Sequence, residues 1–360
     1  MKKKNKGIAI LLGICCVLGV VCVVEYTMLK YEKGHMGQTG ENSKATEWVG
    51  NKGNTADFTD GVSKHGALSV DGVDLVDKDG KSFQLKGVSS HGILWYPDFA
   101  GCLPVAETKK HGANVFRIAA YADDESGGYV QRPEETLRYV RSSIEAVLAN
   151  DMYAIVDWHV LNDGNPLTNK EKAKEFFAQI AGQYGDEPGI IYEICNEPNG
   201  DTTWEDITAY ANEVIPLIRG YAPNALILVG TPEYSYAITK VQGAMLPYEN
   251  VMYSYHFYAG QYDDSYSNML EACRSQGVPI FVSEWGMNIS AGEPGSVLAQ
   301  GQEFVTYLNK EKISWVAWSL SNKNEAFSLL SPECNTYSGW QEEDFTDIGK
   351  IVFQMLGDDK

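Results

Sequence analysis

Eight short runs rich in β-branched and aromatic residues recur along the chain, and longer helical stretches separate them. An alternation of this kind predicts a parallel sheet with crossover helices, and eight such units are the number that closes into a barrel. The runs span residues 83–89, 113–120, 152–158, 189–195, 225–230, 251–257, 279–285 and 313–319. The sequence therefore predicts an α/β fold of the (β/α)8 TIM barrel type.

The stretches around the runs support this interpretation. The segment 133–151 begins with Pro133 and acidic residues, which favour a helix start, and it carries an apolar stripe at helical spacing. This stripe consists of Leu137, Val140, Ile144, Val147 and Leu148. Residues 68–80 read as a short hairpin, and we expect it to close the bottom of the barrel.

The N-terminal residues indicate export. Lysines within residues 2–6 precede an uncharged apolar run from Ile8 to Val24, as in a signal peptide or a signal anchor. Both alternatives stay open for residues 1–30, because no small-residue cleavage site is clear. Residues 31–64 have the Gly-, Asn- and Thr-rich composition of a flexible linker, so residues 65–360 are the predicted catalytic domain. We expect an extracellular protein, secreted or surface-anchored, that meets the membrane only through this apolar segment.

Charge and cysteine spacing narrow the possible partners. A formal net charge of −19 makes nucleic acid a poor partner, whereas a neutral polysaccharide is not repelled and could stack on the 21 Tyr and 8 Trp. No CxxC pair or His-rich spacing points to a metal site, so we expect no metal and no cofactor. The pairing of Cys102, Cys195, Cys273 and Cys334 is left open, and a monomer is the default.

Barrel enzymes carry their chemistry at the carboxyl ends of the strands. Glu197 follows the fourth run and Glu284 ends the seventh, which would place two carboxyl groups across the barrel mouth. Glycoside hydrolysis needs such a pair: a separation of about 5 Å gives retention, and one near 9 Å gives inversion. Strand alternation alone does not choose between Glu193 and Glu197, because both fall on the same side of a continuing strand.

Six segments resemble glycoside hydrolase family 5, the cellulase-A type, and most closely its bacterial endo-β-1,4-glucanase branch. They are NVFRIAAY (114–121), VDWHVLNDGNP (156–166), NEPNG (196–200), YSYHFYAG (253–260), VSEWG (282–286) and WSLSNKNE (318–325). The resemblance covers residues 65–357 and implies that Glu197 is the acid/base and Glu284 the nucleophile.

The neighbours of these acids suit that chemistry. Arg117 near Glu284 would keep the nucleophile ionised, while a drier and less compensated Glu197 would hold its proton. Asn196 could hydrogen-bond the 2-hydroxyl of the sugar at the cleaved bond. His159 and His256 would bind hydroxyls and support the carboxylates. Tyr258 is similar to the family tyrosine that hydrogen-bonds the nucleophile.

Further residues are predicted to bind the sugars on either side of the cleaved bond. Trp318 would stack on the ring at the cleavage site, and the resemblance assigns Trp95, Tyr121 and His91 to the neighbouring glycone subsites. Lys323 and Glu325 are a solvated charge pair or contacts to a more distant sugar. Relatives commonly have a tryptophan where this chain has Tyr234, which would offer the aglycone a smaller stacking face.

The predicted function is hydrolysis of internal β-1,4-glucosidic bonds in β-1,4-glucan or cello-oligosaccharides by double displacement. The first alternative is the same mechanism on mixed-linkage glucan, mannan or xylan, because loops choose the sugar. The second is a glycan-binding barrel without catalysis, which the presence of both Glu197 and Glu284 disfavours.

Overall fold

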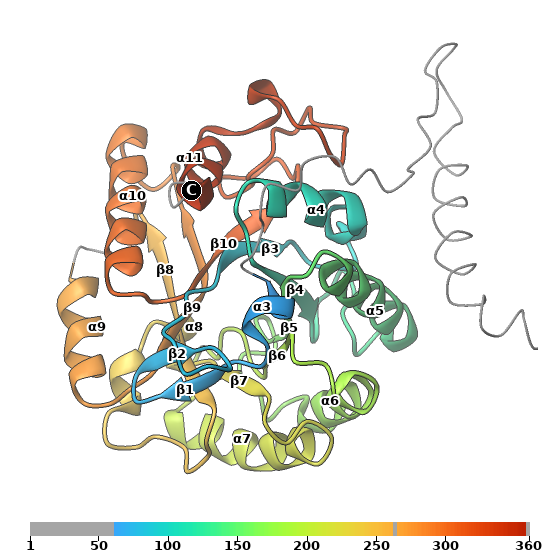
Figure 1. Cartoon of the computed structure of the whole chain (residues 1–360), viewed down its shortest axis with the longest axis vertical. Coiled ribbons are helices and arrows are strands. Elements are labelled where there is room, and N and C mark those ends of the chain that lie inside the picture. Colours follow the sequence, from blue (N-terminus) through green and yellow to red (C-terminus); the bar gives the residue numbers. More distant parts are fainter. Residues whose placement is uncertain (1–60, 262–264, 358–360) are drawn as a thin grey trace, which may run out of the picture. The chain divides into compact units, whose positions relative to one another are not determined.

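A closed barrel of eight parallel strands forms the protein body in the computed structural model, which describes residues 61–261 and 265–357 (Figure 1). The strands follow the order β10-β3-β4-β5-β6-β7-β8-β9 around the barrel. They are β3 Lys86–Ser90, β4 Val115–Tyr121, β5 Tyr153–His159, β6 Ile190–Glu193, β7 Leu226–Val229, β8 Val251–Ala259, β9 Ile280–Met287 and β10 Trp315–Leu320. Each overlaps one of the eight predicted runs, so the predicted (β/α)8 barrel is confirmed.

Helices connect the strands and cover the outer surface of the barrel. The longer ones are α4 Cys102–Lys110, α5 Pro133–Ala149, α6 Lys170–Tyr184, α7 Trp204–Arg219, α9 Tyr266–Ser275, α10 Pro294–Lys310 and α11 Asp347–Gly357. Short turns of helix are α3 Val62–His65, α8 Pro232–Ser235, η1 Pro97–Ala100, η2 Ile238–Val241 and η3 Glu342–Asp344. The predicted stripe of α5 is buried at Leu137, Val140, Ile144 and Val147, while Leu148 is partly buried against the same core.

The lower part of the barrel interior is apolar. One buried cluster joins inward side chains of the strands: Val115, Tyr153, Ile155, Ile191, Leu226, Leu228, Met252, Phe281 and Val316. Leu68 and Leu75 belong to the same cluster and come from the antiparallel hairpin of β1 Ser69–Asp71 and β2 Asp74–Val76. The predicted hairpin therefore closes this end of the barrel (Figure 1).

Strand alternation sorts the side chains between the interior and the helical layer. Along β4, Val115 lies in the lower interior cluster, Arg117 is fully buried above it, and Tyr121 lies in a third cluster at the mouth. The residues between them, such as Phe116 and Ile118, pack in the outer core. Because each strand runs from bottom to mouth, its last inward residues reach the open end.

The predicted N-terminal apolar segment (residues 1–30) and most of the predicted linker lie outside the described residues. At the C-terminal end of the predicted linker, α3 forms, and Ser63 donates through its backbone N–H and hydroxyl to Asp151, both at 2.7 Å. Within residues 61–261 and 265–357, no helix combines the length and apolarity needed to cross a membrane. The cysteines of this part, Cys102, Cys195, Cys273 and Cys334, are free thiols.

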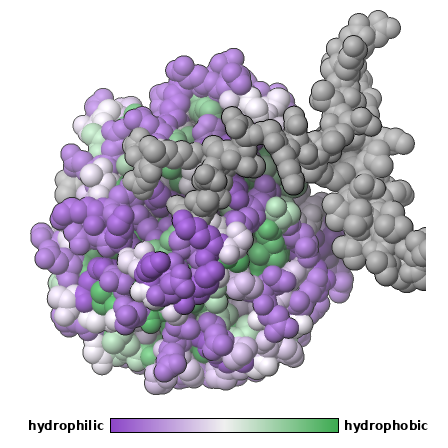
Figure 2. Space-filling view, in the orientation of Figure 1, coloured by the Kyte–Doolittle hydropathy of each residue, from purple (hydrophilic) through white to green (hydrophobic). Residues whose placement is uncertain are grey.

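Hydrophilic residues dominate the face shown in Figure 2, and hydrophobic residues form small separate patches on it. The large hydrophobic side chains that are exposed in the described residues are Leu103, Tyr221, Tyr234 and Met245. Of these four, Tyr234 follows the carboxyl end of β7 and so lies on the loops at the barrel mouth.

Candidate active site

Glu197 and Glu284 meet at the mouth of the barrel. Glu284 lies in β9, and Glu197 follows β6 by four residues. One oxygen of each carboxyl group and a ring nitrogen of His256 all lie within 4.8 Å of one another. The side chain of Glu197 is 12% exposed and that of Glu284 is 6% exposed, so both carboxyl groups are largely shielded from water.

Glu284 receives two strong hydrogen bonds. Arg117 donates from Nη1 to Oε2 at 3.0 Å, and the Tyr258 hydroxyl donates to Oε1 at 2.6 Å. Burial and the charge of Glu197 raise the pKa of Glu284, while His256 and Arg117 oppose that rise. Two donors aimed at one carboxylate favour its charged form.

Glu197 has a different environment. Its Oε1 lies 2.9 Å from Nδ1 of His256. Burial raises the pKa of Glu197 to about 8, and Asp157 and Glu193 add to the rise while Arg117 opposes it. Burial also lowers the pKa of His256 to about 4, so the ring is neutral near pH 7. When the two acids share one proton, Glu197 therefore keeps it and Glu284 carries the charge.

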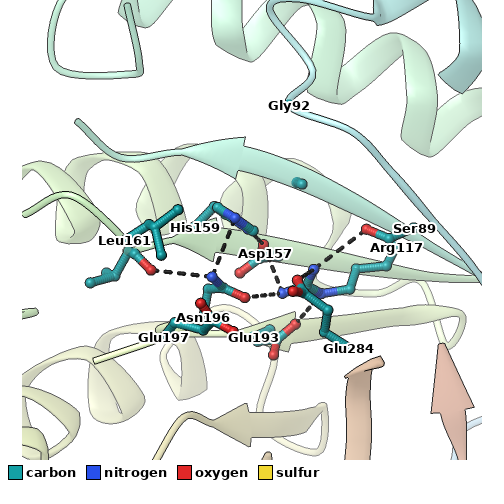
Figure 3. A network of polar contacts seen from close by, with 12 residues as sticks. Ser89, Gly92, Arg117, Asp157, His159, Leu161, Glu193, Asn196, Glu197 and Glu284 are labelled. Atoms are coloured by element: carbon teal, nitrogen blue, oxygen red, sulfur yellow. Dashed lines mark hydrogen bonds and ion pairs between the residues drawn. The ribbon is translucent and has the colours of Figure 1, made fainter. Parts of the chain in front are cut away.

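Arg117 is fully buried and contacts side chains from several strands (Figure 3). Its Nε donates to Glu193 Oε2 at 2.6 Å, and its Nη2 lies 3.0 Å from Asp157 Oδ2. Burial opposes its charge, but Asp157, Glu193 and Glu284 together hold the pKa of Arg117 above its ordinary value. One guanidinium thus compensates carboxyl groups from three other strands.

Asn196 is held by the same network. Its Oδ1 accepts from Arg117 Nη2 at 2.6 Å, and its Nδ2 bonds His159 Nε2 and the Val160 carbonyl, both at 3.2 Å. His159 in turn bonds Asp157 through Nδ1 at 2.6 Å, and burial lowers the pKa of His159 to about 3. Because both N–H groups of the Asn196 amide have protein partners, a sugar hydroxyl would have to share one of them.

The structure separates Glu193 from Glu197. β6 ends at Glu193, whose carboxylate is fully buried inside the barrel and accepts hydrogen bonds from Ser254 at 3.0 Å and Ser283 at 2.5 Å. Cys195 packs in the outer core, so strand alternation does not continue to Glu197. The backbone leaves the strand after Glu193, and this departure brings Glu197 to the mouth.

Aromatic side chains form a cluster at the barrel mouth. The ring of Tyr121 lies 4.4 Å from that of Trp95 and 4.1 Å from that of His159, measured between centroids. Trp318 stacks on His159 at 5.2 Å with an interplanar angle of 18°. Trp318 is 6% exposed and Tyr121 8%. Phe327 packs on Tyr258 at 5.0 Å and was not predicted.

The predicted residues of the more distant subsite also gather in one place. Lys323 Nζ lies 2.6 Å from Glu325 Oε2 and 3.2 Å from His91 Nε2. Burial and Lys323 lower the pKa of His91 to about 3. His91 is 5.2 Å from the Trp318 ring, so this group adjoins the aromatic side chains.

Tyr234 stands apart from this group. Its side chain is 48% exposed, and its backbone N–H donates to the carbonyl of Pro198 at 3.0 Å, beside Glu197. Tyr234 has a left-handed backbone with φ of 61°, as do its neighbours Glu233 and Ser235. The Ser235 hydroxyl donates to the Asn196 carbonyl at 2.6 Å, which ties this turn to the segment that carries Glu197.

Glu197, His256 and Glu284 together also have the composition of a metal-ligand set. Their atoms are already engaged: Glu197 bonds His256, and Glu284 accepts from Arg117 and Tyr258. A cation placed among them would lie close to the Arg117 guanidinium and be repelled by it. The donor set therefore suits proton transfer better than metal binding.

Asp157, Ser254 and Ser283 join the site although the sequence did not single them out. Asp157 and Ser254 each precede a predicted histidine by two residues, so strand alternation could have found them. Ser283 directly precedes Glu284, and alternation would send these two side chains to opposite faces. β9 contains one extra residue relative to β8 between the pairs Ser254–Phe281 and His256–Glu284. This bulge lets both face inward.

Comparison with known proteins identifies the family. The sequence model of the cellulase family, glycosyl hydrolase family 5, matches residues 76–324. An endoglucanase of Clostridium saccharobutylicum is 40% identical over 294 residues, covering 81% of this chain and 65% of that protein. Endoglucanase A of Butyrivibrio fibrisolvens is 40% identical over 297 residues, covering 81% and 69% respectively. The chain thus spans about two thirds of the length of these curated relatives.

Solved structures agree with this match. The catalytic domain of Thermobifida fusca endoglucanase Cel5A has a TM-score of 0.77 and 30% identity, covering 82% of this chain and 98% of that domain. The alkaline cellulase K catalytic domain has a TM-score of 0.75 and 29% identity, covering 83% and 95%. From the family match over most of the barrel and the identity of its relatives, this chain belongs to glycosyl hydrolase family 5, the cellulase family.

Proposed function

We propose that the chain is a retaining endo-β-1,4-glucanase in which Glu197 is the acid/base and Glu284 the nucleophile. The observation that carries this proposal is the approach of the two carboxyl groups, whose nearest oxygens lie within 4.8 Å. Retaining enzymes hold their carboxyl groups about 5–5.5 Å apart, whereas inverting enzymes leave about 6.5–9.5 Å for a water molecule. The separation here agrees with the retaining class.

In the first step, a Glu284 oxygen attacks the anomeric carbon while Glu197 transfers its proton to the departing glycosidic oxygen. The bond between the anomeric carbon and that oxygen breaks, and a glycosyl-enzyme ester forms. Arg117 and Tyr258 favour the charged form of Glu284 before attack, and burial keeps Glu197 protonated.

In the second step, Glu197 changes from general acid to general base. Its carboxylate accepts a proton from water, the water oxygen bonds the anomeric carbon, and the ester bond to Glu284 breaks. Positive charge that develops on the sugar ring in both steps lies beside the carboxylates, with Arg117 compensating them from below. Two inversions leave the anomeric configuration unchanged.

The relatives support β-1,4-glucan as the substrate. Several are named endoglucanases, and a variant of the Thermobifida fusca domain was solved in complex with cellotetraose. In this chain, Trp95, Tyr121 and Trp318 line the mouth beside the acids, where flat faces suit sugar rings. Lys323 and Glu325 would bond hydroxyls of a sugar further along the chain.

The test uses carboxymethylcellulose and the full chain. Viscosity should fall well before many reducing ends appear, because an internal cut shortens the polymer at once. The Glu284→Gln variant should abolish this loss, and Glu233→Gln, which changes an exposed acid near the mouth, should not. Proton NMR of the first product should show the β-anomer. An α-anomer at early times would exclude the retaining mechanism.

Two alternatives are resolved by companion assays. Rates of hydrolysis of lichenan, galactomannan and xylan, measured beside carboxymethylcellulose, test the sugar preference. Hydrolysis of galactomannan alone would overturn the assignment of β-1,4-glucan as the substrate. A binding protein without catalysis would retard soluble β-glucan in a gel and release no reducing ends. The amino-acid sequence does not distinguish among these sugar polymers.

We also propose that the enzyme acts outside the cell, since a polymer cannot enter one. The lysines before the apolar run Ile8–Val24 support export with the body outward. Protease treatment of intact cells should degrade an anchored form, and N-terminal sequencing of protein from the medium should reveal a cleaved one. Protection of the whole chain inside intact cells would contradict export.

A further inference from the structure

We propose that Gly286 and Phe327 form a seat for the Tyr258 ring, and that this ring seat keeps the Tyr258 hydroxyl on the proposed nucleophile Glu284. The inference deepens the proposed function and rests on the assignment of Glu284 as the nucleophile. Gly286 and Phe327 are positioning residues in it, because they act on Glu284 only through Tyr258. The packing of the Tyr258 ring is then part of what keeps the nucleophile charged.

The first part of the ring seat is the backbone of β9 at Gly286. Gly286 pairs with Tyr258 of β8, and it is the next inward position after Glu284, because Trp285 between them packs in the outer core. A β-carbon at Gly286 would lie 2.6 Å from Cε1 and 3.0 Å from Cδ1 of the Tyr258 ring. Nonbonded carbons prefer a separation of about 3.5–4.0 Å, so the ring occupies space that any larger residue would fill.

This position requires glycine for space and not for backbone conformation. Gly286 lies within β9 and is not among the glycines of the described residues that have a positive φ. Alanine could therefore adopt the same backbone, and the contact with Tyr258 is what opposes it. The missing side chain lets the ring reach back along β9 to Glu284, whose Oε1 lies 2.6 Å from the Tyr258 hydroxyl.

The second part of the ring seat is Phe327, on the loop that follows β10. Its ring meets the Tyr258 ring edge to face, with the centroids 5.0 Å apart and the planes at 76°. Two backbone hydrogen bonds tie this part of the loop to β10. The N–H of Ser319 donates to the Phe327 carbonyl at 3.3 Å, and the N–H of Leu329 donates to the Ser319 carbonyl at 3.0 Å. The Phe327 ring is therefore presented from main chain that is anchored to the barrel.

The orientation of the ring matters because Tyr258 has a single hydroxyl to offer. Burial and the charge of Glu284 raise the pKa of Tyr258 well above its ordinary value, so the hydroxyl stays protonated and remains a donor. The hydrogen bond to Glu284 is then lost only when the ring moves. An aligned donor favours the charged form of a carboxyl group, so residues that fix the ring also lower the pKa of Glu284.

Other groups also act on Glu284, and the test must leave them unchanged. Arg117 holds the second carboxylate oxygen of Glu284 at 3.0 Å. The titratable groups that face Glu284 come from β4, β5, β8 and the loop after β6, and they are Arg117, Tyr121, His159, His256, Tyr258 and Glu197. A substitution at Phe327 removes none of these groups and adds no charge, so it tests the ring seat by itself.

The pH dependence of kcat/KM is measured on β-1,4-glucan oligosaccharides with the full chain. The contribution of an edge-to-face aromatic pair corresponds to about 0.4–1 pKa unit, so Phe327→Ala should raise the acidic pKa of the profile by that amount. Phe327→Tyr keeps an aromatic ring in place and should restore the original acidic pKa. Leu161→Ala, which removes apolar bulk from the same mouth cluster, should leave it unmoved. An unmoved acidic pKa in Phe327→Ala, or an equal shift in Leu161→Ala, would overturn the proposal.

A second background tests whether the effect passes through Tyr258. In Tyr258→Phe the ring remains and the donor is gone, so adding Phe327→Ala should raise the acidic pKa no further. A further rise of the same size would mean that Phe327 acts on Glu284 by another route, and it would refute the ring seat. Gly286→Ala should displace the ring and raise the acidic pKa by about one to two units, the full loss of the hydrogen bond. An unmoved acidic pKa in that variant would refute the ring seat as well.

A direct titration does not depend on activity. In the protein labelled with ¹³C at the glutamate side-chain carboxyl, the signal of Glu284 is assigned by its absence in Glu284→Gln. This signal should titrate at a higher pH in Phe327→Ala than in the unaltered chain. Equal midpoints would refute the ring seat whatever the kinetics show. If the chain hydrolyses no β-glycan, the proposed function fails while this titration still decides the role of Phe327.

Discussion

Replacing Tyr258 with phenylalanine isolates one of the two hydrogen bonds that keep Glu284 charged. The hydroxyl donates to Glu284 Oε1 at 2.6 Å, while Arg117 holds the other oxygen. The variant keeps the ring and its packing on Phe327 and loses only the donor. A hydrogen bond to a charged group contributes about 1.5–3 kcal/mol, and one pKa unit corresponds to about 1.4 kcal/mol.

The donor stabilises the ionised form, so its loss should raise the pKa of Glu284 by about one to two units. As the proposed nucleophile, Glu284 would have to be ionised to attack, and the acidic limb of kcat/KM against pH should therefore move to higher pH by that amount. Tyr192→Phe is the control, because the buried Tyr192 hydroxyl has no hydrogen-bond partner among the described residues. An acidic limb that stays in place, or moves to lower pH, would refute the assignment of Tyr258 to this role.

Three further outcomes are expected. Burial raises the pKa of Glu197 to about 8, and as the proposed acid this residue must be protonated to act, so kcat/KM should decline as pH rises through about 8. Glu197→Gln should abolish hydrolysis of unactivated oligosaccharides. Ile155→Ala should lower the free energy of unfolding in urea by about 2–5 kcal/mol, since it opens a cavity in the lower barrel, while exposed Met245→Ala should change it by less than about 0.5 kcal/mol. Lys323→Ala should raise KM for longer cello-oligosaccharides and leave kcat nearly unchanged; a fall in kcat alone would place Lys323 in the chemical step instead.

The strands were predictable because alternation is a local property of the chain. Each predicted run overlaps a barrel strand. The predicted and observed strand ends differ where apolar residues continue beyond the residues that are hydrogen-bonded to the neighbouring strands. Phe83 and Leu85 lie in the lower interior cluster although β3 begins at Lys86. Burial selects apolar residues on both sides of a strand end, so composition alone does not show where the hydrogen-bonded ladder begins.

The residue types at the strand ends were predictable for the same reason, and the partners of those residues were not. Alternation placed Glu193 and Glu197 on one side, but β6 stops at Glu193, and only the path of the following loop separates them. The inward turn of Ser283 depends on an extra residue in β9 relative to its neighbour. Register between strands is a property of the sheet, which no single strand encodes.

The sequence by itself determined the eight-stranded barrel and placed candidate acids at its strand ends, because strand periodicity and strand-end position are read within one segment. The choice of Glu197 over Glu193 came from the family resemblance and not from periodicity. Tertiary structure decided how these groups divide the charge. Arg117 meets carboxyl groups from three other strands, the donors of Arg117 and Tyr258 favour an ionised Glu284, and the unequal environments keep the proton on Glu197. Hydrogen bonding and burial between distant segments exist only once the barrel has closed, and for that reason they lie beyond the reach of local pattern.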